Sequence, residues 1–198
     1  MALRMSINGN GLPMLHEAAV ILGSEAKARR AYRRALNEAG RDTTAPTYRA
    51  LAKQTGLKPT VARRALRAKK AAMGSLSFEL HGKGGDIGLK WFGARETRQG
   101  VSAAPFGKRG IWAGSFIKGG LFPNRKTLKF NGTVFRPGYG GMFSHAWGRP
   151  FSKVRSGVII PREMVKGVTA ETFQSVGGSK LAEKVNRHIR LVTKGVLS

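Results

Sequence analysis

The chain has 198 residues, with 36 lysines and arginines against 10 aspartates and glutamates, and its formal net charge is +26. It contains no cysteine, which excludes disulfides, thiolate metal sites and cysteine nucleophiles. A charge of this size attracts polyanions, meaning nucleic acid, acidic membrane surfaces or acidic proteins.

Residues 1–23 are expected to be an N-terminal arm. Met1–Pro13 is rich in turn residues and has no continuous apolar run after its basic residue, so we expect no secretory signal. No apolar run approaches the length of a membrane span. We therefore expect a protein that is made in the cytoplasm and either stays there or is built into a particle.

Residues 24–73 are predicted to be a basic helical region. Ser24 is a suitable N-cap, and the apolar spacing predicts a helix over Glu25–Ala39 that ends at Gly40. Asp42–Pro46 is predicted to be a turn, followed by helices over Thr47–Thr55 and Pro59–Met73. The polar face of the first helix is almost wholly basic. This face is either a surface that binds polyanions or an ordinary solvated helix face. Its candidate DNA contacts are Arg29, Arg30, Arg33 and Arg34.

The junction at residues 47–73 also suggests a helix-turn-helix, which would make the chain a small DNA-binding regulator. Gly56 suits the turn, Pro59 suits a first helical turn, and Arg63, Arg64 and Arg67 would then reach DNA. The small Ala62 at the usual apolar anchor and the lack of Asn or Gln on the second helix favour an ordinary helical hairpin instead.

Residues 74–198 are predicted to form an α+β core. Alternating apolar residues predict a strand near Leu76–Leu80, and its hairpin partner is expected over Asp86–Phe92. Residues 137–150 form an aromatic and glycine-rich loop, read equally well as a contact arm or as a surface loop. The remaining expected elements are strands over Ala94–Ser102, Ile111–Lys118, Thr127–Phe130, Thr133–Arg136 and Val154–Pro161, a helix from Pro161 that is interrupted at Gly177–Gly178, and a final helix from Ser179.

The fold class that follows is α+β, with N-terminal basic helices, a mostly antiparallel sheet and C-terminal helices packed on the sheet. No catalytic motif is present. The histidines are scattered singly, which predicts no metal site, and we expect no cofactor and no enzymatic activity. Glu79, Asp86 and Glu96 are near one another in the strand region, but in so basic a chain they are expected to balance neighbouring cations.

Three blocks of the sequence carry a family resemblance. They are GGDIGLKWFGARETRQGVSAAPFGKR at Gly84–Arg109, FIKGGLFPNR at Phe116–Arg125 and SKVRSGVIIPREMVKG at Ser152–Gly167. Their order and spacing resemble the minor tail protein Z family of lambda-like phages and prophages. The resemblance extends from about Ala31 to the C-terminal helix, and it is weakest before Ser24 and in Phe135–Pro150.

The resemblance implies a structural minor tail protein of a long-tailed phage, acting in tail completion at the head-proximal end of the tail. Related tail-completion and neck proteins have compact α+β folds and form rings that follow the sixfold symmetry of the tail. The implied location is the virion. The implied partners are the tail terminator, the tail tube, the head-tail connector and further copies of the chain in a hexameric ring, with no membrane.

In such a ring, basic residues of the inner face would hold the end of the packaged DNA through sequence-independent phosphate contacts. Besides the helical arginines, the candidates are Arg95, Arg98, Lys108 and Arg109. Candidate contacts with other subunits or partners are Trp91, Phe92, Phe116, Tyr139, Phe143 and Trp147. The competing classes are the DNA-binding regulator and an RNA-associated basic protein.

Overall fold

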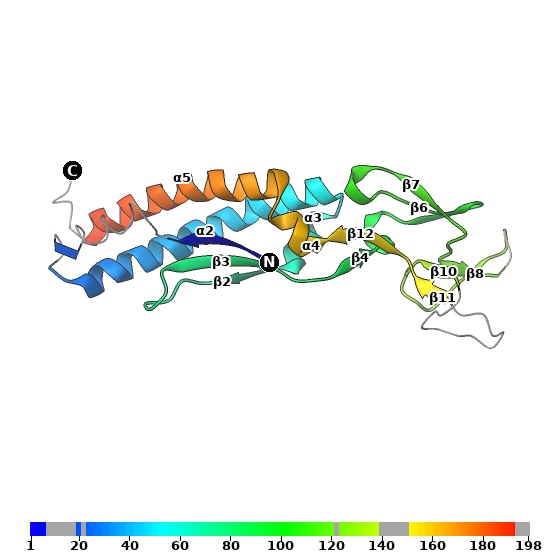
Figure 1. Ribbon diagram of the computed structural model, residues 1–198, viewed down its shortest axis with the longest axis horizontal. Helices are drawn as coiled ribbons and strands as arrows, with labels where there is room; N and C mark the ends of the chain where they lie inside the picture. The colour runs from blue at the N-terminus through cyan, green and yellow to red at the C-terminus, as the bar shows by residue number, and fades with distance from the viewer. Residues whose placement is uncertain (7–18, 21–22, 121–122, 139–150, 193–198) are drawn as a thin grey trace.

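The computed structural model describes residues 1–6, 19–20, 23–120, 123–138 and 151–192. The molecule is elongated (Figure 1). Two long helices, α2 (Glu25–Thr55) and α5 (Gly167–Val192), lie side by side in opposite directions along one half. Most of the strands lie beyond the C-terminal end of α2. This arrangement confirms the α+β class.

Helix α2 is one continuous helix of 31 residues, so the predicted end at Gly40 and the predicted turn at Asp42–Pro46 are wrong. Gly40 lies inside the helix because the ring of Phe78 packs on it: an added Cβ would lie 2.4 Å from Phe78 Cγ. Pro46 removes one backbone donor, yet the helix continues because Thr43 and Thr47 are fully buried there. Tertiary packing overrides both local signals for a helix end.

Helix α5 is also continuous, although an interruption at Gly177–Gly178 was expected. Gly177 is buried against β1 (Ala2–Ser6), where an added Cβ would lie 2.6 Å from Met5 Cε. This glycine therefore permits close approach of the strand and does not end the helix. The short helix α4 (Ile160–Met164) precedes α5, with Pro161 in its first turn as expected.

Helix α3 (Pro59–Ala65) is much shorter than the predicted Pro59–Met73. Gly56 ends α2 in the left-handed conformation with a φ of 76°, as the sequence predicted for the turn. After Ala65 the chain becomes the strand β2 (Leu66–Lys69), which pairs with β3.

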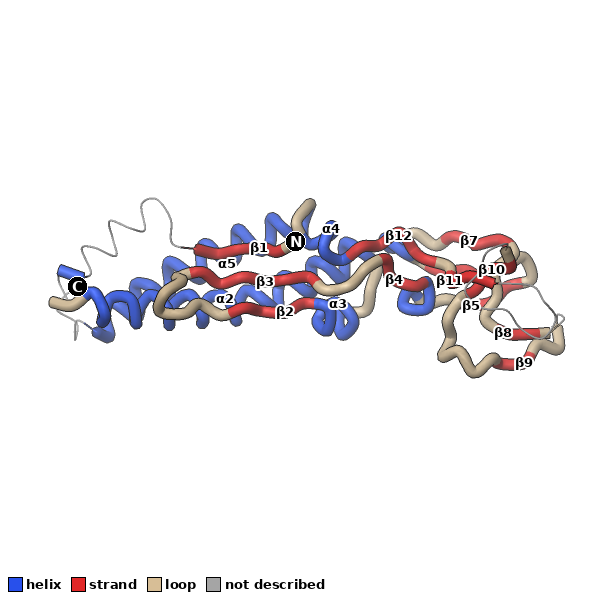
Figure 2. The backbone as a smooth tube through the Cα atoms, turned by 60° about the horizontal axis from the view of Figure 1, so that its bottom comes forward, coloured by secondary structure: helices blue, strands red, loops and turns tan. Residues whose placement is uncertain are grey.

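The first sheet has three antiparallel strands in the order β1-β3-β2. It comprises β1 (Ala2–Ser6), β2 and β3 (Ser77–Gly82), and it covers one side of the helix pair (Figure 2). Strand β3 follows the predicted alternation, with Phe78 and Leu80 buried against the helices. The segments expected as an arm, a helical region and a core thus share one sheet.

Strand β4 (Asp86–Gly88) pairs with β12 (Arg155–Ile159), so the predicted hairpin between β3 and Asp86–Phe92 is wrong. Both edges of β3 are already occupied, by β1 and β2. Only the start of the predicted strand is extended, because Leu89–Phe92 forms the 3₁₀ helix η1.

The remaining strands are short, and every pairing in the described residues is antiparallel. The predicted strand Ala94–Ser102 is a hairpin, and the predicted strand Ile111–Lys118 is broken after Ala113. One sheet contains, in order, β5 (Arg95–Thr97), β6 (Gly100–Ala103) and β7 (Gly110–Ala113), with the 3₁₀ helix η2 (Pro105–Gly107) between β6 and β7. Strand β8 (Lys118–Gly119) pairs with β9 (Lys126–Thr127), and β10 (Phe135–Pro137) pairs with β11 (Phe151–Lys153).

Candidate functional site

The three sequence blocks that carry the resemblance meet in the strand half of the molecule. Asp86 of the first block accepts backbone hydrogen bonds from Ser156 (3.2 Å) and Gly157 (2.9 Å) of the third block. Glu96 of the first block accepts a hydrogen bond from the backbone N–H of Lys118 at 3.1 Å and forms an ion pair with Arg125, both in the second block. Two acids of the first block thus tie it to the other two.

A cluster of phenylalanine rings lies beside this junction. The ring centroids of Phe135 and Phe151 are 5.0 Å apart, and those of Phe130 and Phe135 are 5.1 Å apart. Phe116 joins the cluster with its centroid 6.1 Å from that of Phe135. Phe135 and Phe151 are buried, whereas Phe130 is 41% exposed and faces outward in part.

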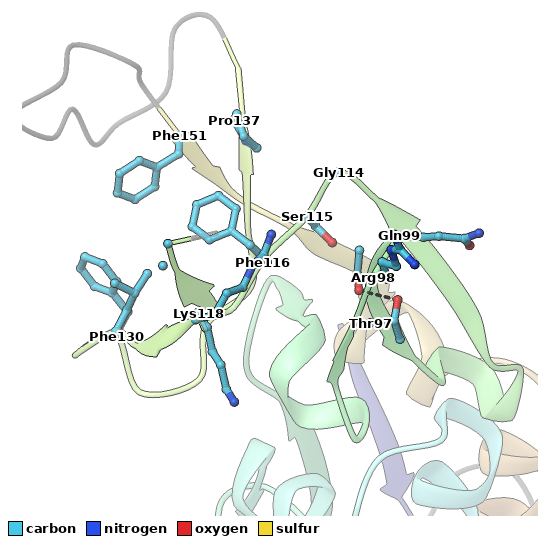
Figure 3. Close-up of a pocket in the computed structure, with 15 residues that line it drawn as sticks. Thr97, Arg98, Gln99, Gly114, Ser115, Phe116, Lys118, Phe130, Pro137 and Phe151 are labelled. Atoms are coloured by element: carbon cyan, nitrogen blue, oxygen red, sulfur yellow. Dashed lines mark hydrogen bonds between the residues drawn. The ribbon is translucent and has the colours of Figure 1, made fainter. Parts of the chain in front are cut away.

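A cavity of about 590 Å³ opens next to these rings. Phe116, Phe130 and Phe151 lie on one side of it, and Thr97, Arg98 and Gln99 of the β5–β6 turn lie on the other (Figure 3). Lys118 and Arg125 also line it, and the described residues of the lining include no carboxylate. Its chemistry is therefore apolar and cationic.

The basic residues predicted near this region do not form one cluster: Arg95 lies in β5, whereas Arg98, Lys108 and Arg109 lie in the connections of the same sheet. Arg95 and Ile111 flank Ser102 on one face of β5-β6-β7, and Arg109 Nη1 donates a hydrogen bond to Ser102 Oγ at 3.1 Å. Strand β6 runs from Gly100 to Ala103. Arg98 and Lys108 precede and follow it, at opposite ends of the sheet.

The helical set Arg29, Arg30, Arg33 and Arg34 lies at the opposite end of the molecule, in the first turns of α2. Arg29 forms an ion pair with Glu25 at 2.7 Å. From Arg34 to the C-terminal end of α2, the 21 residues of helix span about 30 Å at 1.5 Å per residue. The two predicted basic sets therefore form separate surfaces.

The predicted contact residues have different fates. Phe92 is 3% exposed and belongs to the core, so its assignment to an interface is wrong. Trp91 is 41% exposed, and Lys90 Nζ lies 5.1 Å from its ring centroid. Phe116 is half-buried in the cluster beside the cavity. Tyr139, Phe143 and Trp147 lie outside the described residues.

The acids in the described residues are mostly engaged with cations or backbone donors, as expected. Glu79 on the outer face of the first sheet lies 2.9 Å from His81 Nε2, 3.4 Å from Arg4 and 3.7 Å from Lys69. The hydrogen bond from His81 lowers the pKa of Glu79 and is the largest cause of the shift. Burial opposes it as the next-largest cause, and the charges of Lys69 and Arg4 add to the lowering. Glu79, Asp86 and Glu96 therefore serve separate contacts and do not form a catalytic carboxylate pair.

Sequence reasoning placed Arg63, Arg64 and Arg67 on a recognition helix, and it missed Lys69, Lys70 and the continuation of these basic residues from α3 along β2. Arg63, Arg64, Arg67, Lys69 and Lys70 are all exposed. The prediction of one long helix hid their arrangement, because a strand places Arg67 and Lys69 on the same face while a helix would not. Only the density of charge in the segment RRALRAKK could have drawn attention to it.

The geometry at this segment does not favour a helix-turn-helix. The second helix has 7 residues and is followed at once by a strand, which leaves no recognition helix of ordinary length.

In the described residues, no group of three or more histidine or acidic side chains is placed to hold a metal ion. None of the helices in this described part of the chain has the length and apolar character that a membrane span requires.

No protein-family model matches the chain, and searches of curated proteins and of solved structures likewise returned no significant match.

Proposed function

We propose that this chain is a structural minor tail protein of a long-tailed phage, acting in tail completion at the head-proximal end of the tail as part of a hexameric ring. One observation carries the proposal. The three blocks that resemble the minor tail protein Z family are far apart in the sequence, yet they contact one another through Asp86 and Glu96.

Blocks that form one contiguous structural unit can serve a single role together. The aromatic cluster and the cationic cavity lie beside this unit and supply a surface for a neighbouring subunit or for another tail protein. Such a role requires no reaction, and the carboxylates that a hydrolytic mechanism would use are occupied in other contacts.

The large positive charge supports contact with a polyanion. Ion pairs occupy Glu25, Glu79, Glu96, Glu163 and Glu183, so the surplus cations remain at the surface. In a tail that contains the genome end, sequence-independent phosphate contacts are the chemistry that this surplus supplies.

Quantitative mass spectrometry of purified particles of the phage that encodes the chain tests this proposal. We expect a few copies per particle, on the scale of one ring. Absence from particles, with the protein present in the infected or induced cells, would contradict it, and a regulatory role would then have to be tested by DNA binding in cell extracts.

A further inference from the structure

The basic residues of α2 and those of β2 lie next to one another at one point of the fold. The side chain of Asn37 forms two hydrogen bonds with the backbone of Ala71: Nδ2 donates to the carbonyl at 3.1 Å, and the N–H donates to Oδ1 at 2.8 Å. Asn37 is half-buried and Ala71 is buried. This contact fixes the residue after Lys70 against the face of α2 that carries Asn37.

Helical spacing places three arginines beside that contact. Arg30, Arg33 and Arg34 precede Asn37 by seven, four and three residues, and positions separated in this way share one face of a helix. The other basic residues lie on β2 and α3, which precede Lys70 in the sequence. Figure 2 shows β2 at the edge of the sheet, α3 continuing from one end of it, and α2 extending past the other end.

These residues form a continuous line of positive charge, here called the cationic track. It consists of Arg30, Arg33, Arg34, Arg63, Arg64, Arg67, Lys69 and Lys70. The part on α2 spans about 10 Å at 1.5 Å per residue. Strand β2 together with Lys70 spans about 17 Å at 3.3 Å per residue. The track is therefore about 30 Å long.

The charge of the track is almost unopposed. Lys69 forms an ion pair with Glu79, and no other track residue forms an ion pair with the described part of the chain. Glu38, four residues after Arg34, is engaged by α5, with Oε1 lying 3.0 Å from Nε2 of His188. Every track residue except the half-buried Arg33 is exposed. A line of cations with so few acids beside it has a strongly positive local potential.

We propose that the cationic track binds the phosphate backbone of duplex DNA without regard to sequence. Its length matches about eight or nine base pairs at 3.4 Å each. Arginine and lysine supply the phosphate contacts, and the only amide in line with them, Asn37, is already bonded to Ala71. The exposed large apolar residues of the described chain lie elsewhere, so the track offers no aromatic platform of the kind that single strands require.

This inference rests on the proposed function, since it names the surface that would meet the packaged genome. It also differs from both sequence readings. Arg63, Arg64 and Arg67 act from a helix end and a strand edge rather than from a recognition helix, and the helical arginines act with them rather than with Arg95 and Arg109.

The test uses the full-length protein, a fluorescently labelled 30-base-pair duplex of arbitrary sequence, and fluorescence anisotropy over a range of salt concentrations. The track variant carries R34Q, R64Q, R67Q and K70Q. The matched control carries K126Q, K129Q, R162Q and R187Q, which removes the same charge from exposed side chains outside the track. Circular dichroism verifies that both variants are folded.

We expect the track variant to bind at least about tenfold more weakly and to lower the magnitude of the slope of log K against log salt by roughly three to four, at about 0.9 per lost phosphate contact. The control should retain a slope within about one of the wild type. Equal weakening of the two variants would overturn the proposal, because net charge alone would then explain binding.

Two further measurements test whether the track is continuous and whether it prefers nucleic acid. Variants limited to the α2 half of the track (R30Q, R33Q, R34Q) and to the half on α3, β2 and Lys70 (R64Q, R67Q, K70Q) should each lower the magnitude of the slope by about 2.7. An unaffected half would refute a continuous track. Polyglutamate that displaced DNA at equal charge concentration would refute the preference for nucleic acid.

The outcomes separate this inference from the proposed function. Particles that contain the protein, together with variants that bind DNA alike, would overturn the track alone. Track-dependent binding by a protein that is absent from particles would overturn the proposed function alone.

Discussion

Replacing Gly40 by alanine tests whether tertiary packing rather than local sequence determines the course of α2. In an open helical position this substitution stabilises a protein by about 1 kcal/mol. At Gly40 the new Cβ would lie 2.4 Å from Cγ of Phe78 and 2.5 Å from both Cδ atoms. Ordinary carbon contacts are about 1 Å or more longer, so the ring or the helix must move.

Phe78 is 2% exposed, and the atoms that obstruct the Cβ belong to the rigid ring rather than to the end of a flexible chain. Overpacking of this kind costs about 1–3 kcal/mol, and we place Gly40→Ala near the upper end. After subtraction of the gain in helix propensity, we expect a net loss of about 2 kcal/mol. For a chain of this size, that corresponds to a fall in Tm of about 4–8 °C.

Thermal and urea unfolding followed by circular dichroism at the helix band measures the effect. Gly178→Ala is the matched control, since Gly178 is a helical residue of α5 that has no atom within 4 Å of an added Cβ. We expect this control to gain about 0.5–1 kcal/mol. A Gly40→Ala protein as stable as the wild type, beside a stabilised Gly178→Ala protein, would refute the reasoning.

Three further predictions concern side chains that join separate elements. Asn37→Ala removes both hydrogen bonds to Ala71, and we expect a loss of about 1–3 kcal/mol in urea unfolding, while the isosteric Asn37→Asp, which keeps the acceptor, should lose less. Gln54→Ala leaves Thr169 and the carbonyl of Glu163 without their hydrogen-bond partner on α2. Tm should therefore fall by several degrees, and amide hydrogen exchange at the start of α5 should accelerate. Unchanged exchange at the start of α5 would contradict this role of Gln54. Glu79 has a pKa below its usual value of 4.5, so its contribution to stability is present above that pH and is lost as the pH falls through the lowered pKa. Glu79→Gln should therefore reduce the loss of unfolding free energy at acidic pH. An identical loss in the variant would count against the pairing with His81.

Local patterns in the sequence were sufficient for several elements. The alternation of apolar residues near Leu76–Leu80 predicts β3, and Gly56 and Pro59 predict the end of α2 and the start of α3. These features depend on a few neighbouring residues: the conformation of a glycine, the fixed φ of a proline, and the period of a strand. The α+β class follows from the same patterns.

Features that depend on distant residues could not be predicted in this way. Gly40 carries a local signal for a helix end, and only the position of Phe78 shows that its small size serves packing instead. The choice of β12 as the partner of β4 depends on β1 and β2 having already occupied both edges of β3. Pairing of strands is decided by the whole fold, and short strands carry little information of their own.

Of the residues that line the cavity, sequence reasoning had named Arg98 and Phe116 as candidate contacts and no others. Basic residues and phenylalanines were identified, yet the sequence gives no means of seeing that Phe92 is buried while Phe130 is 41% exposed beside a cavity. The cationic track escaped sequence reasoning because it is joined by a long-range contact between Asn37 and Ala71, and because a strand was taken for a helix.

The unbroken course of α2 has a mechanical consequence. Its 31 residues make a stiff rod of about 45 Å, anchored at its far end by Gln54 and by the packing of η2 around Gly56. Such a rod sets a fixed spacing between a ligand bound at the cationic track and a partner that contacts the cationic cavity. Two ligands engaged at once would be held apart at a constant distance, and a pull on one would be transmitted to the other through a helix that resists both bending and stretching.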